Sequence, residues 1–178
     1  MSRVSVTWDF LLSTLFKDAE RMQIECAIGA LLHDREDGLK RNYLIYGPPA
    51  TGKSTILRYI QKIFEKDPDV IVIHDFDPRP RLFKEIEANY SGKVIFAATN
   101  AYSPHIPEAE GGGNWTRIAT RKKSKPLPLN VYNQMCQTLD ESIVEIKYDC
   151  EVQYIYYMKS YENLMQKLKE FNERKTEE

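Results

Sequence analysis

One eight-residue segment constrains the fold of this chain more than any other. Residues 47–54 read Gly-Pro-Pro-Ala-Thr-Gly-Lys-Ser and match the pattern GxxxxGK[ST], which is typical of a phosphate-binding loop between a strand and a helix. Gly47 and Gly52 allow the backbone to curl so that successive N–H groups surround an anion. Lys53 is expected to begin the helix, whose positive dipole end faces the same phosphates.

This segment predicts a nucleotide site that uses ATP and Mg²⁺. Lys53 is expected to reach the β- and γ-phosphates, and the Ser54 hydroxyl is expected to bind the magnesium ion. The residues predicted to hold the nucleotide are Gly47, Pro48, Pro49, Ala50, Thr51, Gly52, Lys53, Ser54 and Thr55.

The sequence around the loop alternates between predicted strands and helices. Strands are predicted at 42–46, 70–74, 94–99 and 142–147, the first three of them buried. Helices are predicted at 53–66, 82–88 and 161–171, with two short ones between residues 8 and 37. Residues 104–130 predict a loop, and 151–158 fit a strand or a helix. The alternation predicts an α/β fold, a parallel sheet flanked by helices.

Length and composition fit one domain with small helical additions. The chain has 178 residues, of which 42% are hydrophobic, so it can bury a core. We expect an N-terminal helical segment at 1–40, an ATPase core at 41–150 and a C-terminal helical segment at 151–178. The net charge of −1 excludes a globally basic nucleic-acid coat.

The sequence also predicts where the protein works. It has no apolar run long enough to span a membrane, and its N-terminus lacks the apolar core of a signal peptide. The three cysteines are too widely spaced for a CxxC metal pair and are expected to be reduced thiols. We therefore expect an intracellular protein, in the cytoplasm or nucleus of the host cell, that is neither secreted nor bound to a membrane.

An ATPase of this kind also needs a carboxylate at the end of a neighbouring strand. The apolar run 70–73 is followed by His74 and Asp75, with Asp77 two residues later. Either Asp75 binds the magnesium ion, or this is only a second strand and the chain lacks such a carboxylate. In a third interpretation, His74 occupies the first acidic position, weakens hydrolysis and leaves a nucleotide-dependent switch. We favour Asp75 as a catalytic and metal-binding residue.

A polar residue also follows the run 94–99. At the carboxyl end of a strand, Asn100 could hydrogen-bond the attacking water or the γ-phosphate. The alternative is that Asn100 only turns the chain. We favour a catalytic role for Asn100.

Read in order, the segments GPPATGKS, IHDF and AATN resemble the AAA+ ATPases. Among these they look most like the superfamily 3 helicases of viruses and phages, in shortened form. The stretch 15–32 resembles the helical lead-in of the primase–helicase type. Asn100 and Pro104, followed by residues 113–118, resemble that group's N…P…GxWRRI stretch. The resemblance covers most of residues 10–150.

The resemblance implies an AAA+-like P-loop fold and assigns roles to residues. Asp75 would be the Walker B acid and Asn100 the sensor 1 residue. Arg117 would be an arginine finger that reaches the nucleotide of a neighbouring subunit, which implies a homo-oligomeric ring, commonly a hexamer. Two other arginines could take the place of this finger, Arg79 and Arg81.

The sequence departs from the family at three points. His74 replaces the first acid of Walker B, and the spans 53–75 and 75–100 are shorter than usual. These spans leave little room for an additional strand and for the hairpin loop that grips DNA in the pore. The chain also shows no nuclease, primase or origin-binding domain.

A cationic stretch follows the predicted sensor. Between Gly111 and Leu139 there is no acid, and Trp115 and Tyr132 flank a run of cations. This stretch could contact single-stranded DNA or RNA, or it could be a solvated loop or face a neighbouring subunit's nucleotide. Its five cations are Arg117, Arg121, Lys122, Lys123 and Lys125.

These observations lead to three functional hypotheses. The first is a magnesium-dependent ATPase, related to helicases, that acts on nucleic acid during replication of a virus, phage or mobile element. The second is a binding module whose assembly ATP controls, with weak hydrolysis. The third is a small-molecule kinase in which Arg79, Arg81 and the cationic stretch hold a phosphorylated acceptor.

Overall fold

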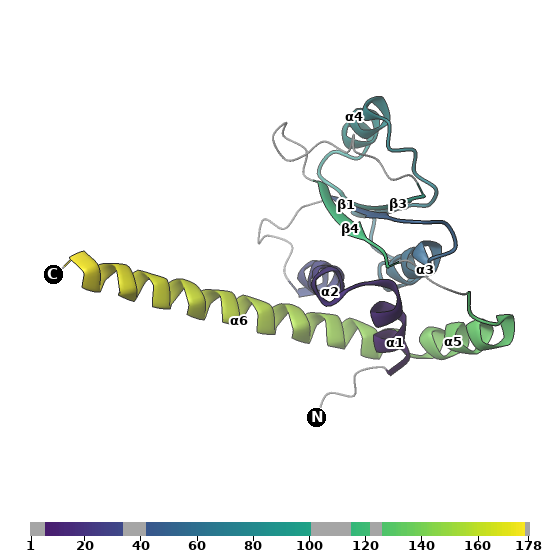
Figure 1. Ribbon diagram of the computed structural model, residues 1–178. Helices are drawn as coiled ribbons and strands as arrows, with labels where there is room; N and C mark the ends of the chain where they lie inside the picture. The colour runs from purple at the N-terminus through teal and green to yellow at the C-terminus, as the bar shows by residue number, and fades with distance from the viewer. Residues whose placement is uncertain (1–5, 34–41, 101–114, 122–125, 177–178) are drawn as a thin grey trace.

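The protein is an α/β structure in which most of the helices lie on one side of a small sheet (Figure 1). The computed structural model describes residues 6–33, 42–100, 115–121 and 126–176. The strands are β1 (Asn42–Tyr46), β2 (Val70–Ile73), β3 (Val94–Thr99) and β4 (Trp115–Ala119). The helices are α1 (Val6–Leu15), α2 (Asp18–His33), α3 (Lys53–Ile63), α4 (Pro80–Asn89), α5 (Leu129–Glu141) and α6 (Ile143–Thr176).

The four strands form one parallel sheet in the order β2-β3-β1-β4. The register pairs Tyr46 of β1 with Thr99 of β3 and with Ala119 of β4. The carboxyl ends of the three strands therefore meet at one edge of the sheet. Ligands of open α/β sheets commonly bind outside this edge.

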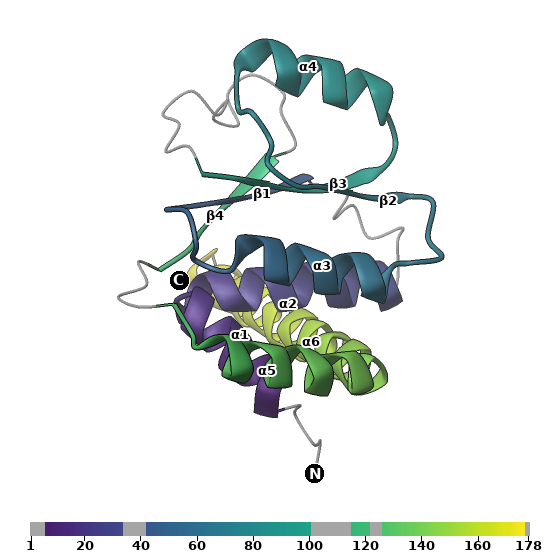
Figure 2. The same ribbon diagram turned by 90° about the vertical axis from the view of Figure 1, so that its right-hand side faces the viewer.

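Helices cover both faces of the sheet, as Figure 2 shows with α4 above and the other helices below. A small cluster under α4 contains the aromatic rings of Phe76, Phe83 and Trp115. The larger core lies on the opposite face, where α1, α2, α3, α5 and α6 contribute buried side chains. The prediction of a parallel sheet flanked by helices is confirmed.

Several local predictions are confirmed by this fold. The expected strands at 42–46 and 94–99 are β1 and β3, and the expected helices at 53–66 and 82–88 correspond to α3 and α4. The N-terminal helical pattern is confirmed as α1 and α2, although its last residues, 34–37, lie outside the described residues. The predicted strand at 70–74 is β2, but it is half-buried rather than buried because it forms an edge of the sheet.

The prediction of a loop throughout 104–130 is wrong in two places. Trp115–Ala119 is the strand β4, which pairs with β1, and α5 begins at Leu129. Trp115 holds β4 in place because its ring packs against Phe83 and its indole N–H donates to Glu87 of α4 at 2.7 Å. These contacts join segments that lie far apart in the sequence, so local patterns did not predict them.

The prediction of a strand at 142–147 is wrong, and 151–158 is helical. Residues 143–147 and 151–158 belong to α6, a continuous helix that runs across residue 150, where a segment boundary was expected. Ile146, Cys150 and Tyr154 are buried at four-residue spacing, which matches a helix packed along α2. Gly29 of α2 permits this close approach, because a Cβ there would clash with the Cys150 carbonyl oxygen.

Helix α5 is fixed against α3 by polar contacts that advance along both helices in the same direction. The hydroxyl groups of Thr55 and Tyr132 lie 3.0 Å apart. One turn later, the Tyr59 hydroxyl donates to the Cys136 carbonyl at 2.9 Å. At the far end, Lys62 forms an ion pair with Asp140, whose carboxyl pKa is lowered by this hydrogen bond. The first of these contacts lies beside the site described below.

Among the described residues, no helix combines the length and the apolar character needed to cross a membrane.

Candidate functional site

The loop between β1 and α3 has an unusual backbone. Gly47, Ala50 and Gly52 all have positive φ, at 156°, 57° and 95°. A side chain at Gly47 would clash with the Thr120 hydroxyl, and one at Gly52 would come within 2.8 Å of Leu15 Cδ2. The two glycines of the motif are therefore required by both backbone conformation and neighbouring atoms.

The ammonium group of Lys53 lies inside this loop. Its side chain is buried and donates to the carbonyl oxygens of Gly47 and Pro48 at 2.8 and 2.6 Å. A longer contact joins it to the Thr51 hydroxyl at 3.3 Å. Burial lowers the pKa of Lys53, and the nearby charge of Asp75 partly opposes this effect. The loop thus holds a poorly hydrated positive charge at the start of α3.

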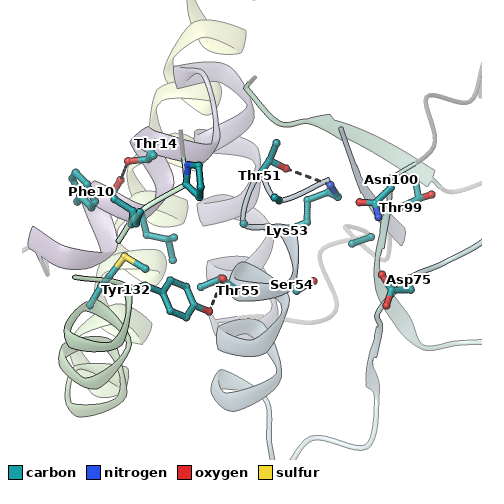
Figure 3. A pocket seen from close by; sticks show the side chains of 17 residues that line it. Phe10, Thr14, Thr51, Lys53, Ser54, Thr55, Asp75, Thr99, Asn100 and Tyr132 are labelled. Carbon is teal, nitrogen blue, oxygen red and sulfur yellow. Dashed lines mark hydrogen bonds between the residues drawn. The ribbon is translucent and has the colours of Figure 1, made fainter. Parts of the chain in front are cut away.

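Two predicted residues reach the same place from the sheet. Asp75 follows β2 and Asn100 follows β3, and both line one pocket with Lys53 and Ser54. The Phe76 N–H donates to the Ala98 carbonyl at 2.7 Å, which holds Asp75 beside the end of β3. Figure 3 shows Asp75 and Asn100 on the side of Lys53 that faces the sheet.

Asp75 has a positive φ of 51°, a conformation that Asp tolerates better than most residues. This turn directs the chain after β2 back toward β3. A carboxylate and a hydroxyl, from Asp75 and Ser54, therefore lie in one pocket with the buried cation of Lys53. Such a set of groups suits a phosphate accompanied by a divalent cation.

The opposite wall of the pocket is formed by helices that sequence reasoning did not connect with the site. Phe10, Leu11 and Thr14 come from α1, and Tyr132 and Met135 come from α5. Figure 3 shows Phe10, Thr14 and Tyr132 across the loop from Asp75. The pocket encloses about 340 Å³. Helical spacing had identified α1, but no sequence signal showed which face of it meets the loop.

Another residue that sequence reasoning missed is Thr120, which follows β4. Its N–H donates to the Tyr46 carbonyl at 2.9 Å, and its hydroxyl lies 3.2 Å from the Thr51 hydroxyl. Thr120 therefore connects the end of β4 to the loop after β1. No motif in the sequence marks it.

The predicted site residues divide into those that line the pocket and those that do not. The segment 50–55 lines it, together with Asp75 and Asn100. Gly47, Pro48 and Pro49 shape the loop from outside the lining. His74 is exposed and does not line the pocket.

The arginines predicted to act as a finger are not among the residues that line this pocket. Arg117 is in β4 rather than in a loop, paired in register with Leu44 of β1. Arg79 and Arg81 are exposed and form ion pairs with Asp77 and Glu85. Of the cationic stretch, Arg121 is exposed, and Lys122, Lys123 and Lys125 lie outside the described residues.

Comparisons of the chain with protein-family models, with curated proteins and with solved structures found no match. Within the described part of the chain, no group of three or more His, Cys, Asp or Glu side chains is placed to hold a metal ion.

Proposed function

We propose that the protein binds and hydrolyses ATP with Mg²⁺ in this pocket, and that its fold is an AAA+-like P-loop fold. The observation that carries the proposal is that four predicted residues from three separate segments line one pocket. Lys53 and Ser54 come from the start of α3, Asp75 follows β2 and Asn100 follows β3. The pocket lies at the edge of the sheet where nucleotides commonly bind in α/β folds.

Each group has a chemical role in this proposal. Lys53 neutralises charge on the β- and γ-phosphates, and the Ser54 hydroxyl binds the magnesium ion. Mg²⁺ usually takes one or two carboxylates plus phosphate oxygens, and Asp75 supplies a carboxylate. In this proposal, the Asn100 amide orients the attacking water. The Asp75 carboxylate also favours the charged form of Lys53, which is the form that binds phosphate.

The helical wall supplies a different kind of contact. Phe10, Leu11 and Met135 are apolar and line the same pocket as the loop. Their side chains can cover the base and ribose while the loop holds the phosphates. We call the side formed by residues 50–55, Asp75 and Asn100 the polar wall, and the side formed by α1 and α5 the helical wall. The affinity for ATP thus depends on both walls, whereas phosphate chemistry depends on the polar wall.

We extend the proposal to a homo-oligomeric ring that acts on single-stranded DNA or RNA. This extension rests on the resemblance to superfamily 3 helicases and on the five cations in the acid-free stretch between Gly111 and Leu139. An arginine finger supplied by a neighbouring subunit increases turnover by about 10³–10⁵-fold. Turnover per chain should therefore rise with protein concentration.

The experiment that tests the proposal measures Mg²⁺-dependent ATP turnover across protein concentration, with and without single-stranded DNA or RNA. The wild type is compared with Lys53→Ala and with Lys66→Ala, which removes an exposed cation from the end of the α3 region. The proposal expects turnover in the wild type and in Lys66→Ala, and its loss in Lys53→Ala. Stimulation by nucleic acid supports the extension.

Other outcomes favour the alternatives. ATP binding with negligible turnover in every condition would favour a nucleotide-gated binding module. His74 is exposed and does not line the pocket, so in that alternative it would slow hydrolysis by replacing an acid and not by contacting the nucleotide. ATP consumption only in the presence of a nucleoside or metabolite would favour a kinase. Absence of ATP binding would contradict all three.

A further inference from the structure

Thr120 lies beside the loop after β1, and backbone contacts on both sides fix its position. Its own N–H donates to the Tyr46 carbonyl at 2.9 Å, at the end of β1. The next N–H along the chain, that of Arg121, donates to the Leu15 carbonyl at 2.7 Å, at the end of α1. Thr120 is therefore tied to both β1 and α1, and these bonds hold its side chain against the loop.

The Thr120 hydroxyl occupies space that the first glycine of the motif leaves open. A Cβ at Gly47 would clash with this hydroxyl, so the missing side chain allows the hydroxyl to approach the loop. The hydroxyl donates to the Thr51 hydroxyl at 3.2 Å and has a longer contact to the Tyr46 carbonyl at 3.4 Å. Because Thr51 is only 2% exposed, water cannot easily replace a partner that is lost here.

The Thr51 hydroxyl has as many partners as its chemistry allows. A threonine hydroxyl has one hydrogen to donate and two lone pairs that accept. Thr51 donates to the Pro48 carbonyl at 3.0 Å, and it accepts from the Thr120 hydroxyl and from the Lys53 ammonium. The end of β4, the loop and the start of α3 therefore meet at one buried oxygen.

The Lys53 ammonium has three N–H donors, and each has an acceptor within the loop. The carbonyl oxygens of Gly47 and Pro48 accept at 2.8 and 2.6 Å, and the Thr51 hydroxyl accepts at 3.3 Å. The contact to Thr51, drawn in Figure 3, is the longest of the three and therefore the weakest. Lys53 can redirect this N–H to a phosphate oxygen at the least cost.

We propose that Thr120 is a positioning residue of the proposed nucleotide site, an inference that rests on the proposed function. When Lys53 turns an N–H toward a phosphate, the Thr51 hydroxyl loses one of its partners. The Thr120 hydroxyl and the Pro48 carbonyl still hold Thr51, so the loop keeps its curled shape around the phosphates. Thr120 does not line the pocket, so it acts through Thr51 and not by contact with the nucleotide.

The test is isothermal titration calorimetry of the full-length chain with Mg·ATP. Thr120→Val keeps the shape of the side chain and removes the hydroxyl, so affinity should fall by about 3–5-fold, as for the loss of one neutral hydrogen bond. Thr120→Ser keeps the hydroxyl and should bind within about 2-fold of the wild type. Thr116→Val is the matched control, because Thr116 begins the same strand level with Tyr43 and does not line the pocket. Thermal unfolding checks that each variant is folded.

A double-mutant cycle tests whether Thr120 acts through Thr51. Thr51→Val and Thr120→Val remove the same contact, so the double variant should bind ATP no more than about 2-fold more weakly than the weaker single variant. A purely structural effect of Thr120 on the sheet would instead make the two losses multiply.

Several results would overturn this inference and leave the proposed function intact. They are full affinity in Thr120→Val, an equal loss in Thr120→Ser or in Thr116→Val, and independent losses in the double-mutant cycle. A wild type that binds no ATP would overturn the proposed function, and this inference with it.

Discussion

The two walls of the pocket take their residues from different kinds of segment in the sequence. The polar wall takes its groups from short motifs: the 47–54 loop, Asp75 directly after β2 and Asn100 directly after β3. The helical wall takes its groups from α1 and α5, which respectively precede and follow all four strands in the sequence. Chemistry on a phosphate needs fixed groups at fixed positions, whereas covering a base needs only apolar surface. We therefore expect substitutions in the polar wall to change turnover and those in the helical wall to change affinity.

The largest effect is expected for Asp75→Asn, which removes the carboxylate of the polar wall. Turnover at saturating ATP should fall by about 100-fold or more, the usual cost of removing one group that stabilises the reacting charge. Asp77→Asn is the matched control, because Asp77 is exposed and pairs with Arg79 outside the pocket. Steady-state ATPase kinetics measure both variants. Equal losses of turnover in the two variants would contradict a specific role for the Asp75 carboxylate.

The next effect is expected for Gly47→Ala, which disturbs the loop itself. The added methyl group would clash with the Thr120 hydroxyl, so we expect a loss of about 1–3 kcal/mol in stability and about 10-fold weaker ATP binding. Gly92→Ala is the control, because Gly92 also has positive φ but its Cβ would enter open space. Adding Thr120→Ala to Gly47→Ala should recover part of the loss. Thermal unfolding and ATP titration test this, and full affinity in Gly47→Ala would contradict the geometry.

A smaller effect is expected for Phe10→Ala in the helical wall. Affinity for ATP should fall by about 3–10-fold, because part of an aromatic side chain no longer covers the ligand. Turnover at saturation should stay within about 2-fold of the wild type, because the phosphate groups are untouched. Val6→Ala on the same helix is the control, since Val6 is exposed and does not line the pocket. A loss of turnover at saturating ATP would contradict the division between the walls.

The hydrogen bond that joins the two walls should contribute less to the affinity for ATP than Phe10 does. Tyr132→Phe removes the hydroxyl that meets Thr55, and one neutral hydrogen bond contributes about 0.5–1.5 kcal/mol. We expect KM for ATP to rise by about 2–5-fold with kcat unchanged. Tyr148→Phe, at an exposed position of α6, should leave both constants unchanged. A fall in kcat rather than a rise in KM would show that Tyr132 affects the phosphate chemistry, as residues of the polar wall do.

The smallest effect on activity is expected for Ala50→Gly. Ala50 has a φ of 57°, which a residue with Cβ adopts at a cost, so glycine should raise stability by about 1 kcal/mol. Affinity for ATP should stay within about 2-fold, because the loop keeps its shape. Ala88→Gly in α4 should instead lower stability by about 1 kcal/mol. Chemical denaturation measures both, and destabilisation by Ala50→Gly would contradict the strained conformation.

The polar wall could be predicted from the sequence because its residues follow closely after predicted strands. Once β1, β2 and β3 were recognised as parallel strands, their carboxyl ends had to meet, and Asp75 and Asn100 had to lie near Lys53. The positive φ of Ala50 was not predicted, since the pattern GxxxxGK[ST] fixes residue types and not this conformation.

The remaining structure depends on contacts between distant segments. The run at 142–147 alternates as a strand would, yet Ile146 begins a buried stripe of a helix that packs mainly against α2. Likewise, Trp115–Ala119 is a strand because it pairs with β1 and because the Trp115 indole N–H donates to Glu87 of α4. Helical spacing identified an apolar face on α1 but gave no information on which loop that face would meet.

The central claim is that Lys53 and its surroundings form a nucleoside triphosphate site. Isothermal titration calorimetry of the full-length chain with ATP, with and without Mg²⁺, tests this claim most directly, with Lys53→Ala and Lys66→Ala as the variants. We predict one ATP bound per chain in the wild type and in Lys66→Ala, with affinity that depends on Mg²⁺, and at least about 10-fold weaker binding in Lys53→Ala. Absence of binding to the wild type, or equal binding to Lys53→Ala, would contradict it.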